Sequence, residues 1–289
     1  MEAAVIVVNW NGRGFLKECL ESLRNQTCKH KTFLVDNGSD DGSVVFVSEL
    51  FPEVEIIKLE KNFGFAKAAN VGIERASKVG YRYIALLNND AKAEKDWLAN
   101  LAAALEGNEE TGIAASKMFF RDRPMVINSA GHIKKCGEII DRGLNKTDRG
   151  QFDRKTNIFG ACGGACMYRR GMLDEVGLFD EEYGSFYEDA DLSWRAKKKG
   201  WKAVFVPRSV VYHKSGGTVT KDPETKKKFD ELRLNNLIRL IKKNGNIIDK
   251  SLATVHWTVL VLRNSIARKL NLTKYKMEYK KRLKGIFGK

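Results

Sequence analysis

The feature that most constrains the fold is a short apolar run that ends abruptly in polar residues. It reads Tyr83-Ile84-Ala85-Leu86-Leu87 and is followed by Asn88-Asn89-Asp90. Such a run is typical of a strand buried on both faces of a parallel sheet, and open α/β sheets bind ligands at the carboxyl ends of these strands. An acidic residue there, Asp90, is suited to hold a divalent cation against a diphosphate. The alternative is that Asp90 is a helix N-cap, because Asp96 to Leu105 has a helical pattern.

The first 95 residues alternate between strand and helix patterns. The predicted strands are Ala3 to Asn9, Thr32 to Asp36, Val54 to Leu59 and the Tyr83 run, and the predicted helices are Gly12 to Gln26, Ser43 to Phe51 and Phe65 to Ser77. Consecutive strand–helix units imply right-handed crossovers. The chain is therefore predicted to be an α/β protein with a mostly parallel sheet flanked by helices.

Beyond Asp96 the pattern is less regular. We expect strands at Ile113 to Phe119 and Ala203 to Val206, short strands with glycine turns between Val126 and Arg142, a glycine-rich segment from Ile158 to Arg169, and a helix from Asp189 to Lys199. There is no internal repeat and no low-complexity run.

Charge divides the chain into two parts. Of the formal net charge of +15, +13 belongs to residues 217–289, which carry 19 Lys and Arg against 6 Asp and Glu. The first 216 residues are thus nearly neutral. With 289 residues and 43% hydrophobic content, we expect one large domain with a basic appendage that begins near residue 221.

Cysteine usage indicates a reducing compartment. The five cysteines are an odd number with no secretory signal, so a disulfide scaffold is not expected. Cys162 and Cys166 are spaced like metal ligands, but no second Cys/His pair accompanies them and the four histidines are scattered. We therefore do not expect a structural zinc ion.

Three carboxylate positions are candidates for one site. Asp36 ends the second predicted strand, Asp90 follows the fourth, and Glu188-Asp189-Ala190-Asp191 begins a helix. In a doubly wound sheet the first two lie on one edge, where an Asp that recognises a base beside an Asp that binds a metal would suit a nucleoside diphosphate. Each alone could instead be a turn or cap residue.

Five ordered motifs carry a resemblance to a known family. They are Val7-Val8-Asn9-Trp10-Asn11-Gly12, Val35-Asp36-Asn37-Gly38-Ser39, Asn62-Phe63-Gly64-Phe65-Ala66, Leu86-Leu87-Asn88-Asn89-Asp90-Ala91, and Gly177-Leu178-Phe179-Asp180 with Tyr187-Glu188-Asp189-x-Asp191-Leu192-x-x-Arg195. Over roughly residues 3–245 the chain resembles family 2 glycosyltransferases of the rhamnosyltransferase-like branch. The resemblance implies a GT-A fold, which is Rossmann-like, and an inverting transfer from a nucleotide diphosphate sugar assisted by Mg²⁺ or Mn²⁺.

The resemblance divides the chain and assigns the nucleotide site. It implies a catalytic domain at 1–220, with the nucleotide at 1–95 and the acceptor side at 96–220, and a basic helical extension at 221–289. Asp36 would accept a hydrogen bond from a pyrimidine imide, with Val8 and Asn9 lining base and ribose. Asn62 and Gly64 would let the backbone approach the nucleotide, although both could simply form the start of a helix.

The metal site departs from the family pattern. In the family, the strand that corresponds to Tyr83 to Leu87 usually ends in Asp-x-Asp. Here Asn88 replaces the first Asp, so that metal binding would rest on Asp90. Asn88 and Asn89 would lie beside the nucleotide. Mg²⁺ keeps several waters and can be held by one carboxylate plus phosphate oxygens. His213 resembles the position that meets the metal or diphosphate, although a lone histidine is often structural.

Asp189 is the candidate general base. A single inverting displacement needs a carboxylate that removes the acceptor proton, and the start of a helix keeps such a group ionised. Glu188 is the second candidate. Asp191 is expected to pair with Arg195 at helical i, i+4 spacing. The small residues from Gly160 to Ala165 would leave room for the donor sugar and diphosphate, or serve tight packing.

The basic extension suggests a membrane surface. Phe229 to Ile241 has enough apolar positions to dock a helix on the body, whereas Leu252 to Leu262 is apolar but too short to span a bilayer. Basic residues mixed with aromatics after Arg263 suit an anionic membrane surface, reached through residues 250–289. Docking on the body or on a partner is the alternative. Nucleic acid is not an expected partner, because no recognition motif is present.

Two functions remain open. The first is a glycosyltransferase that uses dTDP-rhamnose or a UDP-sugar and a saccharide or polyprenyl-diphosphate-linked acceptor, at the inner face of the cell membrane. The second is a catalytically silent nucleotide-sugar-binding or scaffold subunit, suggested by Asn88 and the basic extension.

Overall fold

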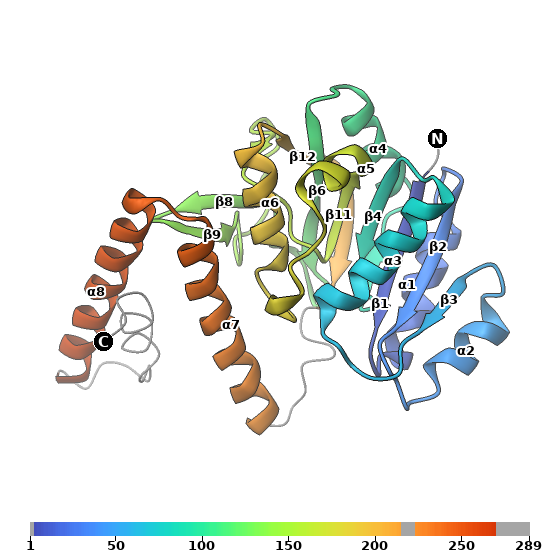
Figure 1. The fold of residues 1–289 in the computed structure, drawn as a ribbon, viewed down its shortest axis with the longest axis horizontal. Coiled ribbons are helices and arrows are strands. Elements are labelled where there is room, and N and C mark those ends of the chain that lie inside the picture. Colours follow the sequence, from blue (N-terminus) through green and yellow to red (C-terminus); the bar gives the residue numbers. More distant parts are fainter. Residues whose placement is uncertain (1–2, 215–222, 270–289) are drawn as a thin grey trace.

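The computed structural model describes residues 3–214 and 223–269 (Figure 1). A ten-stranded sheet forms the centre of the body, with helices on both faces. Residues 270–289, which belong to the predicted membrane segment, lie outside the described residues, as do residues 221 and 222.

The amino-terminal part of the sheet is parallel, as predicted. Its strands are β1 (Ala3–Asn9), β2 (His30–Asp36), β3 (Glu55–Lys58) and β4 (Tyr83–Leu87), in the order β3-β2-β1-β4. The connecting helices are α1 (Arg13–Arg24), α2 (Ser43–Leu50) and α3 (Phe65–Val79). Asn9 is in register with Asp36, so β1 and β2 end at the same level of the sheet.

Antiparallel strands enter the second part of the sheet. β11 (Ala165–Arg169) runs antiparallel between β4 and β6 (Thr111–Phe120), and β12 (Lys202–His213) runs parallel to β6. The remaining strands of this sheet are β5 (Ala91–Ala93), β7 (Arg123–Ser129) and β10 (Asn157–Ile158). The sheet is therefore mixed but mostly parallel.

Two details differ from the sequence expectations. β12 continues to His213 instead of ending at Val206, with a register shift between Val206 and Val210 where Pro207 cannot donate a ladder hydrogen bond. His213 is thus the last residue of the strand and does not follow it. Asp90 is not a helix N-cap, because β5 separates it from α4 (Trp97–Glu106), which Asp96 precedes.

The alternation of side chains builds one core on each face of the sheet. Ile6 and Phe33 point to the face covered by α3, where α5 (Arg170–Val176) and α6 (Glu188–Lys198) also pack. Val5 and Leu34 point to the opposite face, against α1 and α4. Burial on both faces explains why the strands read as nearly continuous apolar runs.

The remaining described elements lie around α6. A hairpin of β8 (His132–Lys135) and β9 (Glu138–Asp141) and a short 3-10 helix η1 (Glu181–Tyr183) are followed by α7 (Pro223–Asn244) and α8 (Ile247–Lys269). α7 lies beside α6, with α8 farther from the sheet (Figure 1). The docking predicted for Phe229 to Ile241 is confirmed by Leu240, which packs with Tyr183, Ala190 and Trp194 of the body. Within the described part of the chain, every helix is too short or too polar to cross a bilayer.

Candidate active site

The carboxyl ends of β1, β2 and β4 are joined by side-chain hydrogen bonds. Asn9 donates from Nδ2 to Asp36 Oδ1 over 3.1 Å and accepts at Oδ1 from Asn89 Nδ2 over 2.8 Å. The second Asp36 oxygen accepts from the Ser39 backbone N–H. All three of Asn9, Asp36 and Asn89 are buried. The residues predicted to meet the nucleotide are thus fixed in place by one another.

Asp90 and His213 meet at the end of β4. His213 Nε2 lies 2.9 Å from Asp90 Oδ1 and 3.1 Å from Asn88 Nδ2, and its other ring nitrogen contacts Asn128 Oδ1. Asp90 and His213 are both buried. The meeting of these two predicted metal ligands could not be read from the sequence, in which they are 123 positions apart.

The glycine-rich segment connects Asn88 to Asp189. The Asn88 backbone N–H donates to Gly164 O over 2.9 Å, and the preceding Gly163 N–H donates to Asp189 Oδ2 over 2.7 Å. Asp36, Asp90 and Asp189 therefore belong to one connected set of contacts. A Cβ on Gly163 would stand 3.4 Å from Asp189 Cβ, so tight packing is one role of this segment.

The two adjacent carboxyl groups at the start of α6 have different surroundings. Asp189 accepts backbone N–H groups at both oxygens, from Gly163 and from Ala190. Glu188 is buried, and among the described residues its Oε2 has no hydrogen-bond partner. Burial, followed by the nearby charge of Asp189, raises the pKa of Glu188 well above its ordinary value. This environment favours the protonated form of Glu188.

Asp191 forms the ion pair with Arg195 that its i, i+4 spacing predicted. It is fully buried and pairs with Arg195 over 2.8 Å. Arg195 also donates to Leu178 O, which attaches α6 to the segment that precedes η1.

Asn62 and Gly64 form the start of α3. Asn62 Oδ1 accepts from Gly64 N–H and from Asn37 Nδ2. Gly64 has φ of +88°, and a Cβ there would lie 2.8 Å from Gly184 O, so this position requires glycine. Val8 is half-buried against the core. The nucleotide contacts assigned to these three residues stay predictions.

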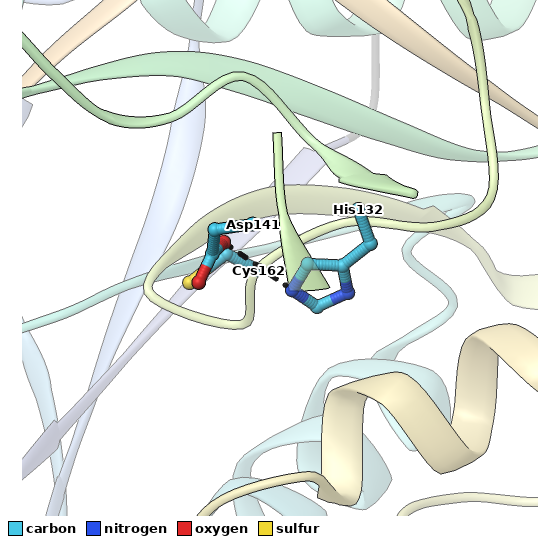
Figure 2. Close-up of side chains that lie close together, drawn as sticks. All are labelled: His132, Asp141 and Cys162. Atoms are coloured by element: carbon cyan, nitrogen blue, oxygen red, sulfur yellow. Dashed lines mark ion pairs between the residues drawn. The ribbon is translucent and has the colours of Figure 1, made fainter. Parts of the chain in front are cut away.

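A further cluster joins the β8–β9 hairpin to the glycine-rich segment. Figure 2 shows His132, Asp141 and Cys162 converging, with an ion pair between the first two. Their potential ligand atoms all lie within 4.8 Å of one another. The sequence does not reveal this cluster, because the cysteine near Cys162 in the chain is Cys166, whereas the β8–β9 hairpin supplies the other two groups.

The His132–Asp141 contact has the chemistry of an ion pair. Burial alone would lower the pKa of His132, but the Asp189 and Asp141 carboxylates raise it above its ordinary value. Burial would raise the pKa of Asp141, but the hydrogen bond with His132 lowers it below the usual range. Both changes favour a charged pair. Burial raises the pKa of the Cys162 thiol, and each of the five cysteines is free.

Asp90 and His213 offer a donor set that suits a divalent cation. A carboxylate oxygen and an imidazole nitrogen that already lie within 2.9 Å of each other could contact the same ion. Mn²⁺ accepts both ligand types, and Mg²⁺ prefers the oxygen. The Asn88 side chain, next to His213, offers an amide in place of the second carboxylate.

The open mixed sheet, with polar groups at the carboxyl ends of its strands and a carboxylate at the start of a neighbouring helix, has the arrangement of the GT-A fold. Residues 4–177 match the model of Glycosyl transferase family 2. The chain therefore belongs to that family and is a glycosyltransferase.

Relatives and solved structures agree with this class. The chain is 27% identical over 243 residues to N-acetylglucosaminyl-diphospho-decaprenol L-rhamnosyltransferase of Mycobacterium tuberculosis H37Rv, covering 76% of this chain and 78% of that protein. It is 28% identical over 250 residues, 85% of each chain, to the uncharacterized glycosyltransferase YwdF of Bacillus subtilis.

Two solved structures share the fold. Mannosyltransferase PcManGT from Pyrobaculum calidifontis, in complex with GDP-Man and Mn²⁺, has a TM-score of 0.60 at 16% identity over 98% of this chain and 83% of that one. S. aureus TarS 1-349, in complex with UDP, has a TM-score of 0.56 at 19% identity over 88% of this chain and 70% of that one. At these identities the likeness shows the fold alone.

Proposed function

We propose that the protein transfers a sugar, with inversion, from a pyrimidine-nucleotide diphosphate donor to a saccharide or lipid-linked acceptor. dTDP-rhamnose is the first donor to consider and UDP-sugars the next. The observation that carries the proposal is the connected set of contacts from Asp36 through Asn9, Asn89 and the Asp90–His213 pair to Asp189. The rhamnosyltransferase relative, named for a lipid diphosphate acceptor, supports the same chemistry.

Asp189 acts as the general base. The acceptor oxygen attacks the anomeric carbon while the bond from that carbon to the diphosphate oxygen breaks, and the acceptor proton passes to Asp189. The N–H groups of Gly163 and Ala190 orient its carboxylate. Asp189 lies in the first turn of α6, at the positive end of the helix dipole.

The nucleotide lies at the other end of the site. Asp36 accepts the imide N–H of a pyrimidine ring, with Val8 and Asn9 along base and ribose and with Asn62, Gly64 and Asn89 nearby. Asp90 and His213, with Asn88 beside them, would hold Mg²⁺ or Mn²⁺. The cation supplies positive charge that stabilises the departing diphosphate.

The experiment is a donor-turnover assay with purified protein. Release of dTDP from dTDP-rhamnose, or of UDP from a panel of UDP-sugars, is measured with Mn²⁺ or Mg²⁺ and again with excess EDTA. We expect release with at least one donor, and a loss of at least tenfold in EDTA. Absence of transfer and of hydrolysis with every pyrimidine donor would contradict the proposal.

That negative outcome would favour the second candidate, a silent nucleotide-sugar-binding subunit. The observation in its favour is Asn88, which removes one carboxylate from the cation site. Calorimetry with UDP and dTDP distinguishes the two functions, since the silent subunit binds a nucleotide that it does not turn over.

We also propose that α8 binds the inner face of an anionic membrane, where a polyprenyl-linked acceptor would be found. One face of α8 packs on α7 through Ala253 and Trp257. Another face exposes apolar side chains at helical spacing: Ile248, Leu252, Val255 and Val259. A stripe of this kind, in a segment of high positive charge, suits a helix lying in the interface.

A further inference from the structure

The loop that precedes the candidate base has an unusual backbone. Phe186 and Tyr187 have φ of 71° and 69°, two consecutive bulky residues in the left-handed region, and Tyr187 directly precedes Glu188 and Asp189. Bulky L-residues rarely adopt this conformation, and it persists only where the surroundings hold it. The segment 183–187, termed here the base loop, therefore needs external support.

Asn236 of α7 supplies that support. Its Nδ2 lies within hydrogen-bond distance of three base-loop carbonyl oxygens, at 2.7 Å from Tyr183, 2.8 Å from Ser185 and 3.1 Å from Phe186. Asn236 is buried, with 3% of its surface exposed. The two N–H groups of this amide are thus shared among carbonyls of the base loop, of which Tyr183 O also accepts from Ser185 N–H.

Other groups of α7 hold the same loop and the helix after it. The Phe186 ring packs edge-on against Phe229 with centroids 5.8 Å apart, and Arg233 lies over it. Near the end of α7, Asn244 and Lys243 both contact the buried Asp191 of α6, at 2.7 Å and 3.0 Å. α7 therefore contacts both the base loop and Asp191, two residues after Asp189 in the first turn of α6.

The other side of the base loop is fixed by α3. Ala66 N–H donates to Gly184 O over 2.8 Å, and Phe65 N–H donates to Ser185 Oγ over 3.2 Å. α3 contacts the middle of the loop, while Asn236 contacts residues on both sides of Gly184. Loss of Asn236 would free the stretch next to Asp189 and leave the α3 contacts in place.

We infer that Asn236 is a positioning residue for sugar transfer. It holds the base loop in its left-handed conformation, so that Asp189 remains against Gly163 N–H and faces the acceptor. The inference rests on the proposed function, because it acts through Asp189 as the base. If so, α7 is required for catalysis, whereas the role proposed for α8 is membrane binding.

The test is a double-mutant cycle between Asn236→Leu and Asp189→Asn. Nucleotide release is measured with whichever of dTDP-rhamnose and the UDP-sugars the wild-type protein turns over. We expect Asn236→Leu to lower kcat at least tenfold with unchanged affinity for UDP or dTDP by calorimetry. In the Asp189→Asn background it should change the residual kcat less than twofold, since groups that act as a unit are not additive.

The matched control is Asn235→Leu, at the exposed neighbouring position, which should leave kcat and the thermal midpoint unchanged. If Asn236→Leu does not fold, Asn236→Ser, which keeps one donor, takes its place and should give a smaller loss in the same cycle. Equal fold-losses in both backgrounds would overturn the inference, as would wild-type kcat in Asn236→Leu. A wild-type protein that turns over no donor would instead contradict the proposed function.

Discussion

At the scale of single residues, two adjacent carboxyl groups have been given different chemistry by their neighbours. Both oxygens of Asp189 accept backbone N–H groups, whereas Glu188 is buried and its pKa is raised. The sequence placed both at the start of a helix and could rank them only by the family pattern. The distinction comes from Gly163, 26 positions away in the chain, and no local rule predicts that contact.

Asp189→Asn is therefore expected to bind nucleotide normally and to lose turnover. The amide keeps the size of the carboxylate but cannot accept the acceptor proton, and general base catalysis commonly contributes about 10²- to 10⁴-fold in rate. The measurement is kcat for nucleotide release, with UDP or dTDP affinity measured by calorimetry. Glu188→Gln should retain most of the rate, because Glu188 already favours its protonated form.

Asp174→Asn serves as the control for Asp189→Asn. Asp174 lies on α5 with 64% of its side chain exposed and should be silent in the same assay. If Asp189→Asn kept the wild-type rate and Glu188→Gln lost it, the base would be Glu188.

At the scale of elements, the parallel strands and their helices were predictable because the spacing of apolar residues differs between a strand and a helix. β1 to β4 and α1 to α3 appear within a few residues of the expected bounds. The segment between β4 and α6 was less predictable. β11 and β5 form through pairing with strands that are distant in the sequence, so they need little intrinsic strand preference of their own.

The β8–β9 hairpin also gives a pH prediction. His132 has a pKa raised above 6.5, so the stability it contributes is fully present below pH 6.5 and is lost as pH rises through the pKa in the folded protein. Asp141 has a lowered pKa, and its contribution is lost only at acidic pH, below about 4. The thermal midpoint should therefore fall between pH 6 and pH 9, by about 2–4 °C for each kcal/mol lost.

His132→Gln should flatten this decline, because glutamine does not titrate. His30→Gln is the control: burial lowers the pKa of His30, so its contribution has the opposite sign, and removing it should leave the decline unchanged or steeper. A decline of equal slope in wild-type protein and His132→Gln would show that other groups cause it.

At the scale of the whole molecule, the sequence located the basic extension but not its relation to the site. Leu237 and Ile241 mark one apolar face of α7 in the sequence, and that face packs on Ala253 and Trp257 of α8 and on Tyr187 of the body. The hydrophobic pattern does not show what the polar side of α7 contacts. Asn236 looks like an ordinary polar residue in the sequence, and only the fold brings the base loop next to it. The division at residue 220 stays a prediction.

Membrane binding is testable at the same scale. The paired substitution Leu252→Asp and Val255→Asp changes two exposed positions of α8, so the fold should persist while binding to anionic vesicles falls. We expect at least a fivefold loss in sedimentation with phosphatidylglycerol-containing liposomes. Thr258→Asp, also exposed, controls for added negative charge. Undiminished sedimentation of the double variant would locate the membrane contact outside this face of α8.

The antiparallel strand β11 has a consequence for how the chain is made. It occupies the middle of the sheet, between β4 and β6, yet its residues 165–169 are synthesised after both neighbours. Until residues 165–169 leave the ribosome, β4 and β6 each have an unpaired edge where β11 will lie. Such unpaired apolar edges can pair with other chains. A nascent chain that stops short of residue 169 should therefore be the form most dependent on chaperones, whereas one that has passed it can fill the gap between β4 and β6.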